Sequence, residues 1–296
     1  MVQHLAVHHF AVQHLAAPPE WGWYIVWYFF LGGLAGGAYL LGTLLRRSGD
    51  PGDLPMARLA FVVSLAATAI CPVLLTLDLG RPERFWHMLV DAGGGGLGFK
   101  YWSPMSVGAW ILLVFGGFAT VSCVGALAPA SGLGALLAGG FGRWFHGIGA
   151  LAGLALAGYT GVLLSVSNVR VWSDSWALGG LFLASGLGIA AAVLGLLAAR
   201  RGESATTAKL WRVDGWFLKL ELGVLLVFFV TLRGVPAEFA RGPCLALWVV
   251  VLAGNLAPLA LHARASPGRA VLAPVLVLLG GLALRTVVVL GPQTPS

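Results

Sequence analysis

Charged side chains are scarce in this sequence. Asp, Glu, Lys and Arg together make up 10% of the 296 residues, whereas hydrophobic residues make up 58% and the mean hydropathy is +0.88. Soluble domains typically contain about 25% charged residues. The composition therefore excludes an ordinary soluble domain and predicts an all-α integral protein of the lipid bilayer, for which we expect no nucleic-acid partner.

Cysteine and histidine are too sparse for the metal sites of electron-transfer proteins. Cys71, Cys123 and Cys244 lie far apart, and none belongs to a CxxC or comparable ligand spacing. A haem inside a helical bundle needs paired histidines within the spanning helices, but His146 and His262 sit at the ends of apolar segments. We therefore expect this protein to bind no haem and no iron–sulfur cluster, and to have no metal of its own.

The first twenty residues differ from the rest. They contain four histidines and a repeated VQHLA (residues 2–6 and 12–16), but no basic stretch and no small-residue cleavage site. We interpret residues 1–20 as a short amphipathic lead-in rather than a signal peptide, followed by one membrane domain at 21–293. His4 and His8 have the spacing of a metal-binding pair, but without a third ligand such a pair is more often solvated.

Apolar stretches long enough to cross a bilayer recur along the membrane domain. One span needs about 20 apolar residues, and eight stretches meet this requirement: 22–45, 59–79, 106–128, 144–166, 177–199, 215–232, 243–262 and 270–290. Small residues are dense within them, which favours close helix packing in lipid over a phosphate-binding role. The expected fold is a bundle of eight transmembrane helices, with both termini on one side.

The distribution of basic residues predicts the orientation. The loops after the first, third, fifth and seventh spans contain ten Lys and Arg residues, whereas the opposite face contains six. Cytoplasmic loops are enriched in basic residues. The odd-numbered loops are therefore expected in the cytoplasm, and both termini outside it.

The segment LTLDLGRPERFWHML (residues 75–89) places several charged side chains directly after an apolar span. With this orientation, Asp78 lies at the outer surface, and Tyr24, Tyr159 and Arg285 reach the same level in the first, fourth and eighth spans. An arginine within a span costs at least ~2.5 kcal/mol unless it faces a partner or water. We therefore expect Arg285 to pair with Asp78; the alternative is that both side chains extend to the lipid headgroups.

The sixth span contains a further charge. Glu221 lies about 9 Å along the span at 1.5 Å per residue, and Asp214, seven residues earlier, shares its helix face. Lys219 lies on another face, while Asn255 in the seventh span would extend the polar lining. Carboxylates inside a bundle are what a proton relay requires, and the alternative is a structural carboxylate hydrogen-bonded to a neighbouring helix.

Several segments together resemble the NrfD family, the membrane subunits of polysulfide reductases. The similar segments are WGWYIVWYFFLGGLAGGAYLLG, LDLGRPERFWHML, SPMSVGAWIL, GYTGVLLSVSNVRVWSDS, FLASG, KLELGVLL and GGLALRTVVVLGPQ. They follow one another in the family's order from about residue 20 to residue 293. Each segment is a weak signal alone, and the specificity comes from their combined coverage.

The resemblance implies a multi-pass subunit of a bacterial cytoplasmic membrane, often viewed as two four-helix halves. Such subunits dock a ferredoxin-like iron–sulfur subunit and exchange electrons and protons with a membrane quinone, which can be menaquinone or ubiquinone. A catalytic subunit of molybdopterin or multihaem type would complete the complex. The redox centres would belong to these partners, because this protein is expected to hold none.

The resemblance also implies a quinone site at the face where the iron–sulfur partner docks. Tyr159 matches the tyrosine of the family's YTG motif and is the best candidate donor to a quinone carbonyl. Tyr24, Arg285 and Arg81 are further quinone-site candidates, and Asp78 and Glu221 are candidate proton carriers. Some relatives have a histidine in the first span, which this sequence lacks, so the partner of the second carbonyl stays open.

The loop at residues 80–104 would form the rim of that site. Arg81 and Arg84 can pair with an acidic partner surface or with Asp78, and Pro82 stops the preceding helix. The aromatic side chains of this loop also suit the membrane interface, which is the alternative explanation for them.

Two other functions are compatible with a protein of this kind. One is a membrane anchor that holds catalytic subunits without binding quinone. The other is a secondary transporter, for which broken helices in matched halves are expected. Pro72 and Pro258 lie well inside spans, but at unmatched positions, which disfavours the transporter.

Overall fold

The computed structural model describes residues 21–90, 96–232, 239, 242–263 and 269–293. Their long helices are α2 (Trp23–Arg47), α3 (Leu54–Asp78), α4 (Pro104–Leu127), α6 (Gly140–Ser165), α8 (Leu178–Arg200), α9 (Ser204–Thr231), α10 (Gly242–Ala263) and α11 (Arg269–Leu290). Short helices lie between or after them: η1 (Pro51–Asp53), η2 (Pro82–Met88), α5 (Gly132–Ala138), α7 (Arg170–Ser173) and η4 (Gly291–Gln293). No β-strand occurs among the described residues, which confirms the all-α prediction. The predicted lead-in at residues 1–20 lies outside them.

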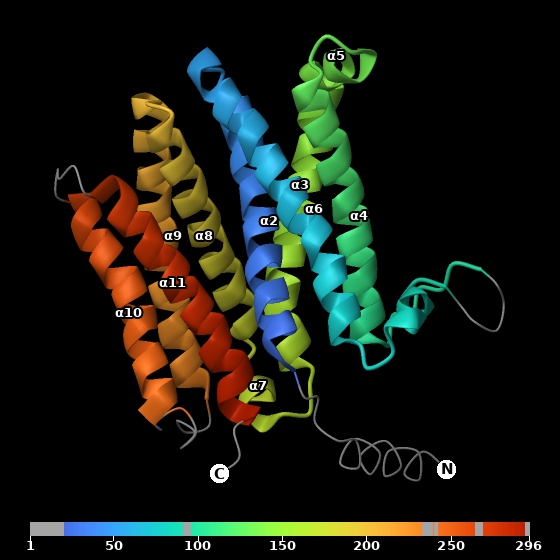
Figure 1. The fold of residues 1–296 in the computed structure, drawn as a ribbon, viewed down its shortest axis with the longest axis vertical. Helices are drawn as coiled ribbons and strands as arrows, with labels where there is room; N and C mark the ends of the chain where they lie inside the picture. The colour runs from blue at the N-terminus through green and yellow to red at the C-terminus, as the bar shows by residue number, and fades with distance from the viewer. Residues whose placement is uncertain (1–20, 91–95, 233–238, 240–241, 264–268, 294–296) are drawn as a thin grey trace.

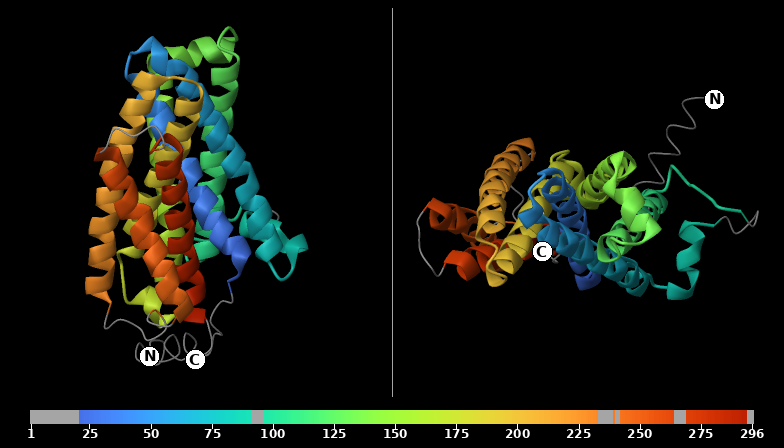
Figure 2. Two further views of the ribbon diagram at one scale, coloured as in Figure 1. Left: turned by 60° about the vertical axis from the view of Figure 1, so that its left-hand side comes forward. Right: turned by 90° about the horizontal axis from the view of Figure 1, so that it is seen from above.

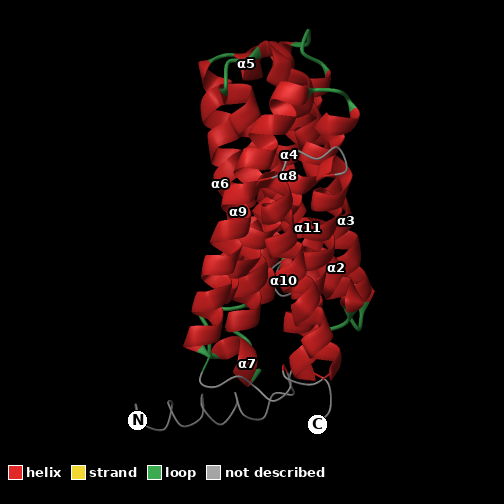
Figure 3. Ribbon diagram, turned by 90° about the vertical axis from the view of Figure 1, so that its left-hand side faces the viewer, coloured by secondary structure: helices red, strands yellow, loops and turns green. Residues whose placement is uncertain are grey.

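The long helices run along one common direction, and the loops lie at the two ends of the molecule (Figures 1 and 3). One end contains α7, η2 and the first and last described residues, and we call it the terminal end. The other end contains η1 and α5, and we call it the opposite end. At the terminal end, the Trp21 main-chain N–H donates to Gln293 Oε1 at 2.8 Å, and Gln293 Nε2 donates back to the Trp21 carbonyl at 3.1 Å. The described part of the protein therefore starts and finishes at the same end.

The contacts between helices fall into two groups (Figures 1 and 2). In the first group, α2 packs against α3 and α6, and α4 packs against both α3 and α6. In the second group, α8 packs against α9 and α11, and α10 packs against both α9 and α11. The groups meet where α2 and α6 pack against α8 and where α2 contacts α11. The helix α2 is accordingly the most enclosed element of the first group.

Glycines allow the helices to approach closely at this junction. A Cβ atom on Gly33 of α2 would lie 3.0 Å from the Gly186 Cα of α8, and one on Gly36 would lie 2.1 Å from the Gly153 carbonyl oxygen of α6. Neither distance leaves room for a side chain. The prediction that these glycine-rich stretches serve helix packing is confirmed at these positions.

Seven of the long helices are long and apolar enough to cross a membrane, so the protein is a multi-pass membrane protein. The exception is α9, in which charged side chains interrupt the apolar sequence. Each of the eight predicted stretches corresponds to one of the long helices. The sixth starts at Ser204 rather than 215, because its first turns are polar and hydropathy alone does not detect them.

Candidate functional site

A pocket of about 330 Å³ opens at the terminal end of the first helix group. It is lined by the start of α2, the end of α3, the start of α4 and the last turns of α6. Its polar lining comes from Asp78, Tyr159 and Tyr28. The structure therefore brings together Asp78 and Tyr159, two residues that the sequence placed at one level.

Tyr159 is held against the beginning of α4. Its hydroxyl group donates a hydrogen bond to the carbonyl oxygen of Pro104, the first residue of α4. A Cβ atom on Gly108, one turn later, would lie 2.6 Å from Tyr159 Cε1, so the absence of a side chain there makes room for the tyrosine ring. The helix start and the glycine together fix the ring in the pocket wall.

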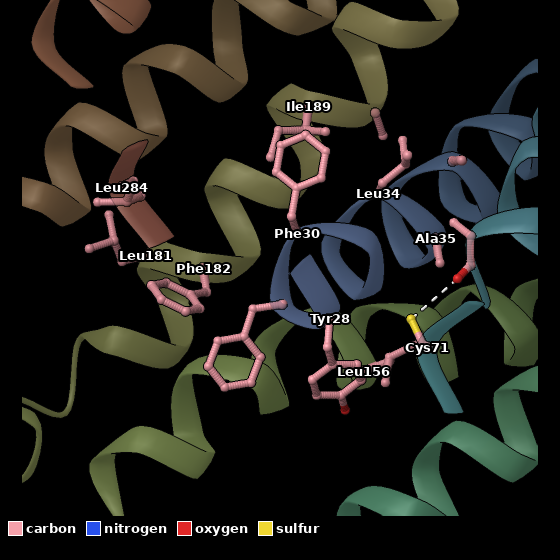
Figure 4. Packing of buried hydrophobic residues seen from close by; sticks show 14 of the residues in the cluster. Tyr28, Phe30, Leu34, Ala35, Cys71, Leu156, Leu181, Phe182, Ile189 and Leu284 are labelled. Atoms are coloured by element: carbon pink, nitrogen blue, oxygen red, sulfur yellow. Dashed lines mark hydrogen bonds between the residues drawn. The ribbon is translucent and has the colours of Figure 1, made fainter. Parts of the chain in front are cut away.

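The aromatic residue that α2 contributes to the pocket is Tyr28 rather than the expected Tyr24. Tyr28 is buried, whereas Tyr24 is 48% exposed and does not line the pocket. Figure 4 shows Tyr28 and Phe30 leaving α2 on different sides. Asp78, the last residue of α3, is partly buried and accepts a hydrogen bond from the Gly22 main-chain N–H. Arg81 is exposed and also lies outside the pocket lining.

An apolar groove adjoins this pocket. It has a volume of about 620 Å³ and runs between α3 and α4, with η2 at one end. The groove and the pocket share four lining residues, which are Leu75, Leu79, Met88 and Ala109, so the two spaces lie side by side. Gly117 of α4 lines the groove, and a Cβ atom there would meet no other atom within 4 Å. A pocket with polar side chains therefore lies next to a long apolar groove.

Arg285 lies in a different place from the one expected. The predicted pair with Asp78 is wrong, because the guanidinium group is fully buried between α11, α8 and α2. Its Nη1 donates to Ser185 Oγ at 3.0 Å and to the Gly281 carbonyl at 2.9 Å. Two helices can reach the same depth without being neighbours, and α11 is separated from the end of α3 by α2 and α8.

Aromatic rings enclose this guanidinium group. The Arg285 Cζ atom lies 5.2 Å from the ring centroid of Phe182 and 5.7 Å from that of Phe30. A Cβ atom on Gly33 would lie 2.8 Å from Arg285 Nη2. Such ring contacts favour a buried cation, and they explain why this arginine is accommodated at the junction of the two helix groups.

Glu221 is buried in the second helix group with Arg285 as its nearby cation. Asn255 Nδ2 lies 3.5 Å from Glu221 Oε1 and also donates to the Val251 carbonyl at 3.0 Å. Ser185 lies between the glutamate and the arginine and interacts with both. The polar lining predicted for Glu221 and Asn255 is therefore present.

Asp214 and His262 form a second polar pair between α9 and α10. The distance between Asp214 Oδ2 and His262 Nε2 is 2.8 Å, and Asp214 is buried. Asp214 and Glu221 occupy the same buried face of α9, as their spacing predicted. Lys219 lies elsewhere, with Nζ 4.8 Å from the ring centroid of Trp216.

Three buried polar atoms in these clusters have no hydrogen-bond partner among the described residues. They are Asp214 Oδ1, Asn255 Oδ1 and Arg285 Nε. Buried polar atoms are nearly always satisfied by protein or by ordered water. These three atoms lie on α9, α10 and α11, which indicates sites for water molecules in the interior of the second helix group.

The segment after α3 presents exposed aromatic and basic side chains at the terminal end. Phe85, Trp86, Tyr101 and Trp102 are exposed, as are Arg81 and Arg84. Residues 91–95 of this loop lie outside the described part of the protein. Among the described residues, no cluster of three His, Cys, Asp or Glu side chains could hold a metal ion.

Comparison with known proteins gives three matches. The family model described as "Polysulphide reductase, NrfD" matches residues 12–295. The C chain of polysulfide reductase from Wolinella succinogenes is 28% identical over 313 aligned residues, which cover 93% of this protein and 94% of the relative. The C subunit of selenate reductase from Mesobacillus selenatarsenatis is 30% identical over 96 residues, which cover 32% of this protein and 20% of the relative.

Proposed function

The protein belongs to the NrfD polysulphide reductase family, and we propose that it is the membrane subunit of a bacterial reductase complex that exchanges electrons and protons between a membrane quinone and an iron–sulfur subunit. The observation that supports this function best is the polar pocket with an apolar groove directly beside it. A respiratory quinone has the same two parts, a ring with two carbonyl groups and a long isoprenoid tail. Menaquinone and ubiquinone share this character.

The pocket residues have distinct roles in this proposal. Bound quinone supplies the two-electron chemistry, in which reduction takes up two protons. Tyr159 would donate a hydrogen bond to one ring carbonyl in place of the Pro104 carbonyl, and Tyr28 would offer a second hydroxyl group from α2. Asp78 lines the same pocket at the end of α3 and exchanges protons there with water. Tyr24, Arg81 and Arg285 are not needed in this arrangement.

The exposed surface after α3 is the proposed docking site for the iron–sulfur subunit. It lies at the terminal end beside the pocket, since Met88 of η2 lines both the pocket and the groove. Arg81 and Arg84 are exposed and form no ion pair with any described residue. Basic side chains of this kind attract an acidic partner surface. A ferredoxin-like subunit bound here would bring its cluster to the quinone end, with the catalytic subunit behind it.

We further propose that α9 crosses the membrane as an eighth span, which gives two four-helix bundles in the cytoplasmic membrane. Trp21 and Gln293 lie side by side, and an odd number of crossings would separate them. The 28 residues of α9 extend about 42 Å at 1.5 Å per residue, which exceeds the roughly 30 Å thickness of the hydrocarbon core. The excess of Lys and Arg in the loops of the opposite end supports the proposal that the terminal end lies outside the cytoplasm.

Glu221 is proposed to relay protons from the cytoplasmic side. The Asp214–His262 pair lies nearer the opposite end, and the Glu221–Asn255 pair lies two helical turns deeper. Unpartnered atoms at Asp214 and Asn255 mark places where water can complete the path. The alternative is a structural role in which Glu221 only joins neighbouring helices.

The quinone pocket is tested by filling the apolar groove. Gly117→Leu places a side chain in open space within the groove, so we expect weaker binding of long-tailed quinones and unchanged binding of short-tailed analogues. The matched control is Gly223→Leu, on an exposed position of α9 where an added Cβ would also meet no atom within 4 Å. Binding is measured by extraction of quinone from the purified complex and by titration with analogues of different tail lengths.

The outcomes separate a quinone subunit from a simple anchor. The proposal is supported if the wild-type extract contains stoichiometric long-tailed quinone. The amount should be lower in Gly117→Leu and unchanged in Gly223→Leu. If the wild-type complex assembles normally but contains no quinone, the proposal is wrong and the protein is a membrane anchor. Equal retention in all three proteins would remove the groove from the site.

A further inference from the structure

A second cavity, of about 190 Å³, lies at the opposite end of the first helix group. It is enclosed by the last turn of α2, the end of α5 and the first turns of α6. We call it the arginine cavity, and its lining includes Thr43, Arg46, Arg47, Leu137, Arg143 and His146. None of these residues belongs to the proposed quinone pocket.

The arginine cavity concentrates positive charge without a matching carboxylate. Arg46, Arg47 and Arg143 form no ion pair with any residue that the structure describes. Arg46 Nη2 donates to the Leu137 carbonyl at 3.1 Å, and Arg47 Nη2 donates to the Arg143 carbonyl at 2.5 Å. A guanidinium group has five N–H donors, so most of the donors around the cavity stay available for a ligand.

The acidic side chains on the neighbouring turn are already engaged. Lys209 Nζ lies 2.8 Å from a carboxylate oxygen of Asp50 and 2.8 Å from one of Asp53. The hydrogen bond from Lys209 holds the pKa of Asp50 below its usual range. Asp53 also accepts from Ser48 at 2.6 Å and from Thr206 at 2.8 Å. These carboxylates therefore neutralise Lys209 rather than the three arginines.

A buried histidine adds an unused polar group to this cavity. His146 is 3% exposed, and its Nδ1 lies 3.1 Å from Ser122 Oγ, which lies 2.7 Å from the Tyr39 hydroxyl group. If Tyr39 donates to Ser122, Ser122 donates to Nδ1, and the proton of the neutral ring is then on Nε2. Nε2 has no hydrogen-bond partner among the described residues. In that arrangement, Nε2 of His146 can donate a hydrogen bond to a ligand in the cavity.

Exposed apolar side chains occur on the same helices that enclose the arginine cavity. Leu136, Phe141 and Trp144 are all more than half exposed and belong to α5 and the first turns of α6. Exposed tryptophan beside basic residues is typical of the level where a helix meets the lipid headgroups. A ligand at this cavity would have its acyl chains against these side chains.

We propose that the arginine cavity binds the phosphate group of an anionic phospholipid headgroup. Phosphate oxygens match guanidinium groups in bidentate geometry, and Arg46 and Arg143 supply two such groups on α2 and α6. Nε2 of His146, which has no partner among the described residues, can supply a further donor from the cavity wall. The bound phosphate offsets the local positive charge and ties α2, α5 and α6 together at this end of the bundle.

The test uses the full-length protein purified in mild detergent. Native mass spectrometry after transfer from phosphatidylglycerol or phosphatidylcholine bilayers reports the lipid retained, and titration calorimetry with inorganic phosphate reports binding of the free anion. Arg143→Gln is the key variant, because its side chain is exposed and forms no hydrogen bond with any described residue, so the fold should persist. We expect about tenfold weaker retention of phosphatidylglycerol, consistent with the loss of one charge-assisted contact.

The control is Arg200→Gln, which removes an exposed arginine from the end of α8. Retention of phosphatidylglycerol in this variant should equal that of the wild type. Equal losses in Arg143→Gln and Arg200→Gln, or no preference for phosphatidylglycerol over phosphatidylcholine, would overturn the proposal. Tight binding of inorganic phosphate without retained lipid would overturn the lipid assignment in favour of a free phosphate ligand.

Discussion

Asp214 and His262 face each other across α9 and α10, with Oδ2 and Nε2 2.8 Å apart. Glu221 lies seven residues after Asp214 on α9, and Asn255 lies seven residues before His262 on α10. Glu221 and Asn255 form the second pair, with Asn255 Nδ2 3.5 Å from Glu221 Oε1. Seven residues correspond to about two helical turns, or about 10.5 Å along the axis. The two antiparallel helices therefore present two polar pairs, one above the other, along one buried seam.

The Asp214–His262 pair should make a coupled contribution to stability. His262→Leu leaves the buried carboxylate of Asp214 without its observed partner, which costs about 3–5 kcal/mol when a buried charge loses its counterpart. The double variant Asp214→Leu/His262→Leu removes both polar groups and should be closer to the wild type. Thermal unfolding of the three proteins in detergent measures the coupling, and additive losses would show that the two side chains stabilise the fold independently.

Glu221→Gln distinguishes a proton relay from a structural role. Glutamine keeps the size and the hydrogen bonding of the side chain but cannot exchange a proton at neutral pH. In vesicles, a relay predicts loss of proton uptake from the cytoplasmic side while the complex still assembles and binds quinone. Asp214→Asn should show a milder loss, because it lies nearer the end of α9 and water can replace it.

The matched control for the relay is Asp50→Asn, which changes an exposed carboxylate at the opposite end, outside the docking surface and the Asp214–Glu221 face. Proton uptake in this control should equal that of the wild type. Full proton-coupled activity in Glu221→Gln would eliminate the relay. A structural role instead predicts normal turnover for Glu221→Gln and loss of assembly for Glu221→Leu.

Arg285→Met should impair assembly more than any substitution in the pocket. It removes the positive charge that favours the Glu221 carboxylate. It also leaves the Ser185 hydroxyl and the Gly281 carbonyl without the hydrogen-bond donor that they have in the structure. The expected loss is about 3–5 kcal/mol, as for other buried charges left without a partner. The amount of folded protein in the membrane measures the effect, and the further change Glu221→Gln should restore part of it. Normal amounts of Arg285→Met protein would contradict this interpretation.

Tyr159→Phe tests the proposed donor in the quinone pocket. It removes one hydroxyl group and keeps the ring beside Gly108, so assembly should be unchanged while quinol-linked turnover falls at least about tenfold. Tyr24→Phe is the control, since Tyr24 lies outside the pocket lining. Wild-type turnover in Tyr159→Phe, measured with a quinol analogue, would remove this hydroxyl group from the mechanism.

The orientation is tested at the C-terminal side of η4. A reporter enzyme that works only outside the cytoplasm should be active when it is fused after Gln293. The reason is that the loops rich in Lys and Arg are at the opposite end. Activity of a reporter that works only in the cytoplasm would invert the orientation. The proposed docking surface would then face the cytoplasm as well.

Composition and hydropathy were sufficient to predict the long helices. Apolar length alone locates a spanning helix, because a bilayer imposes one thickness on every span. The start of α9 was missed since its first turns, from Ser204 to Arg212, are polar. The shared face of Asp214 and Glu221 was predictable because it depends only on local helix geometry.

The lateral arrangement of the helices was not predictable from the same information. Arg285 and Asp78 were expected to pair because they reach a similar depth, but depth does not determine which helices are neighbours. The sequence also did not indicate that Tyr28, rather than Tyr24, lines the pocket. Their spacing places both near one side of α2, but only packing against α3, α4 and α6 decides which of them lines a pocket. The groove between α3 and α4 has no local sequence signal of its own.

The position of α2 makes it a mechanical link between the two helix groups. Tyr28 lines the pocket at the end of the first group, whereas Phe30 and Gly33, less than two turns further on, contact Arg285 on the other side. The glycine contacts with α6 and α8 leave no free space for this helix to shift independently. A rotation or translation of α2 that reshapes the pocket would therefore also move the atoms around Arg285. We expect the two sites to be coupled through this one helix, without a continuous series of hydrogen bonds between them.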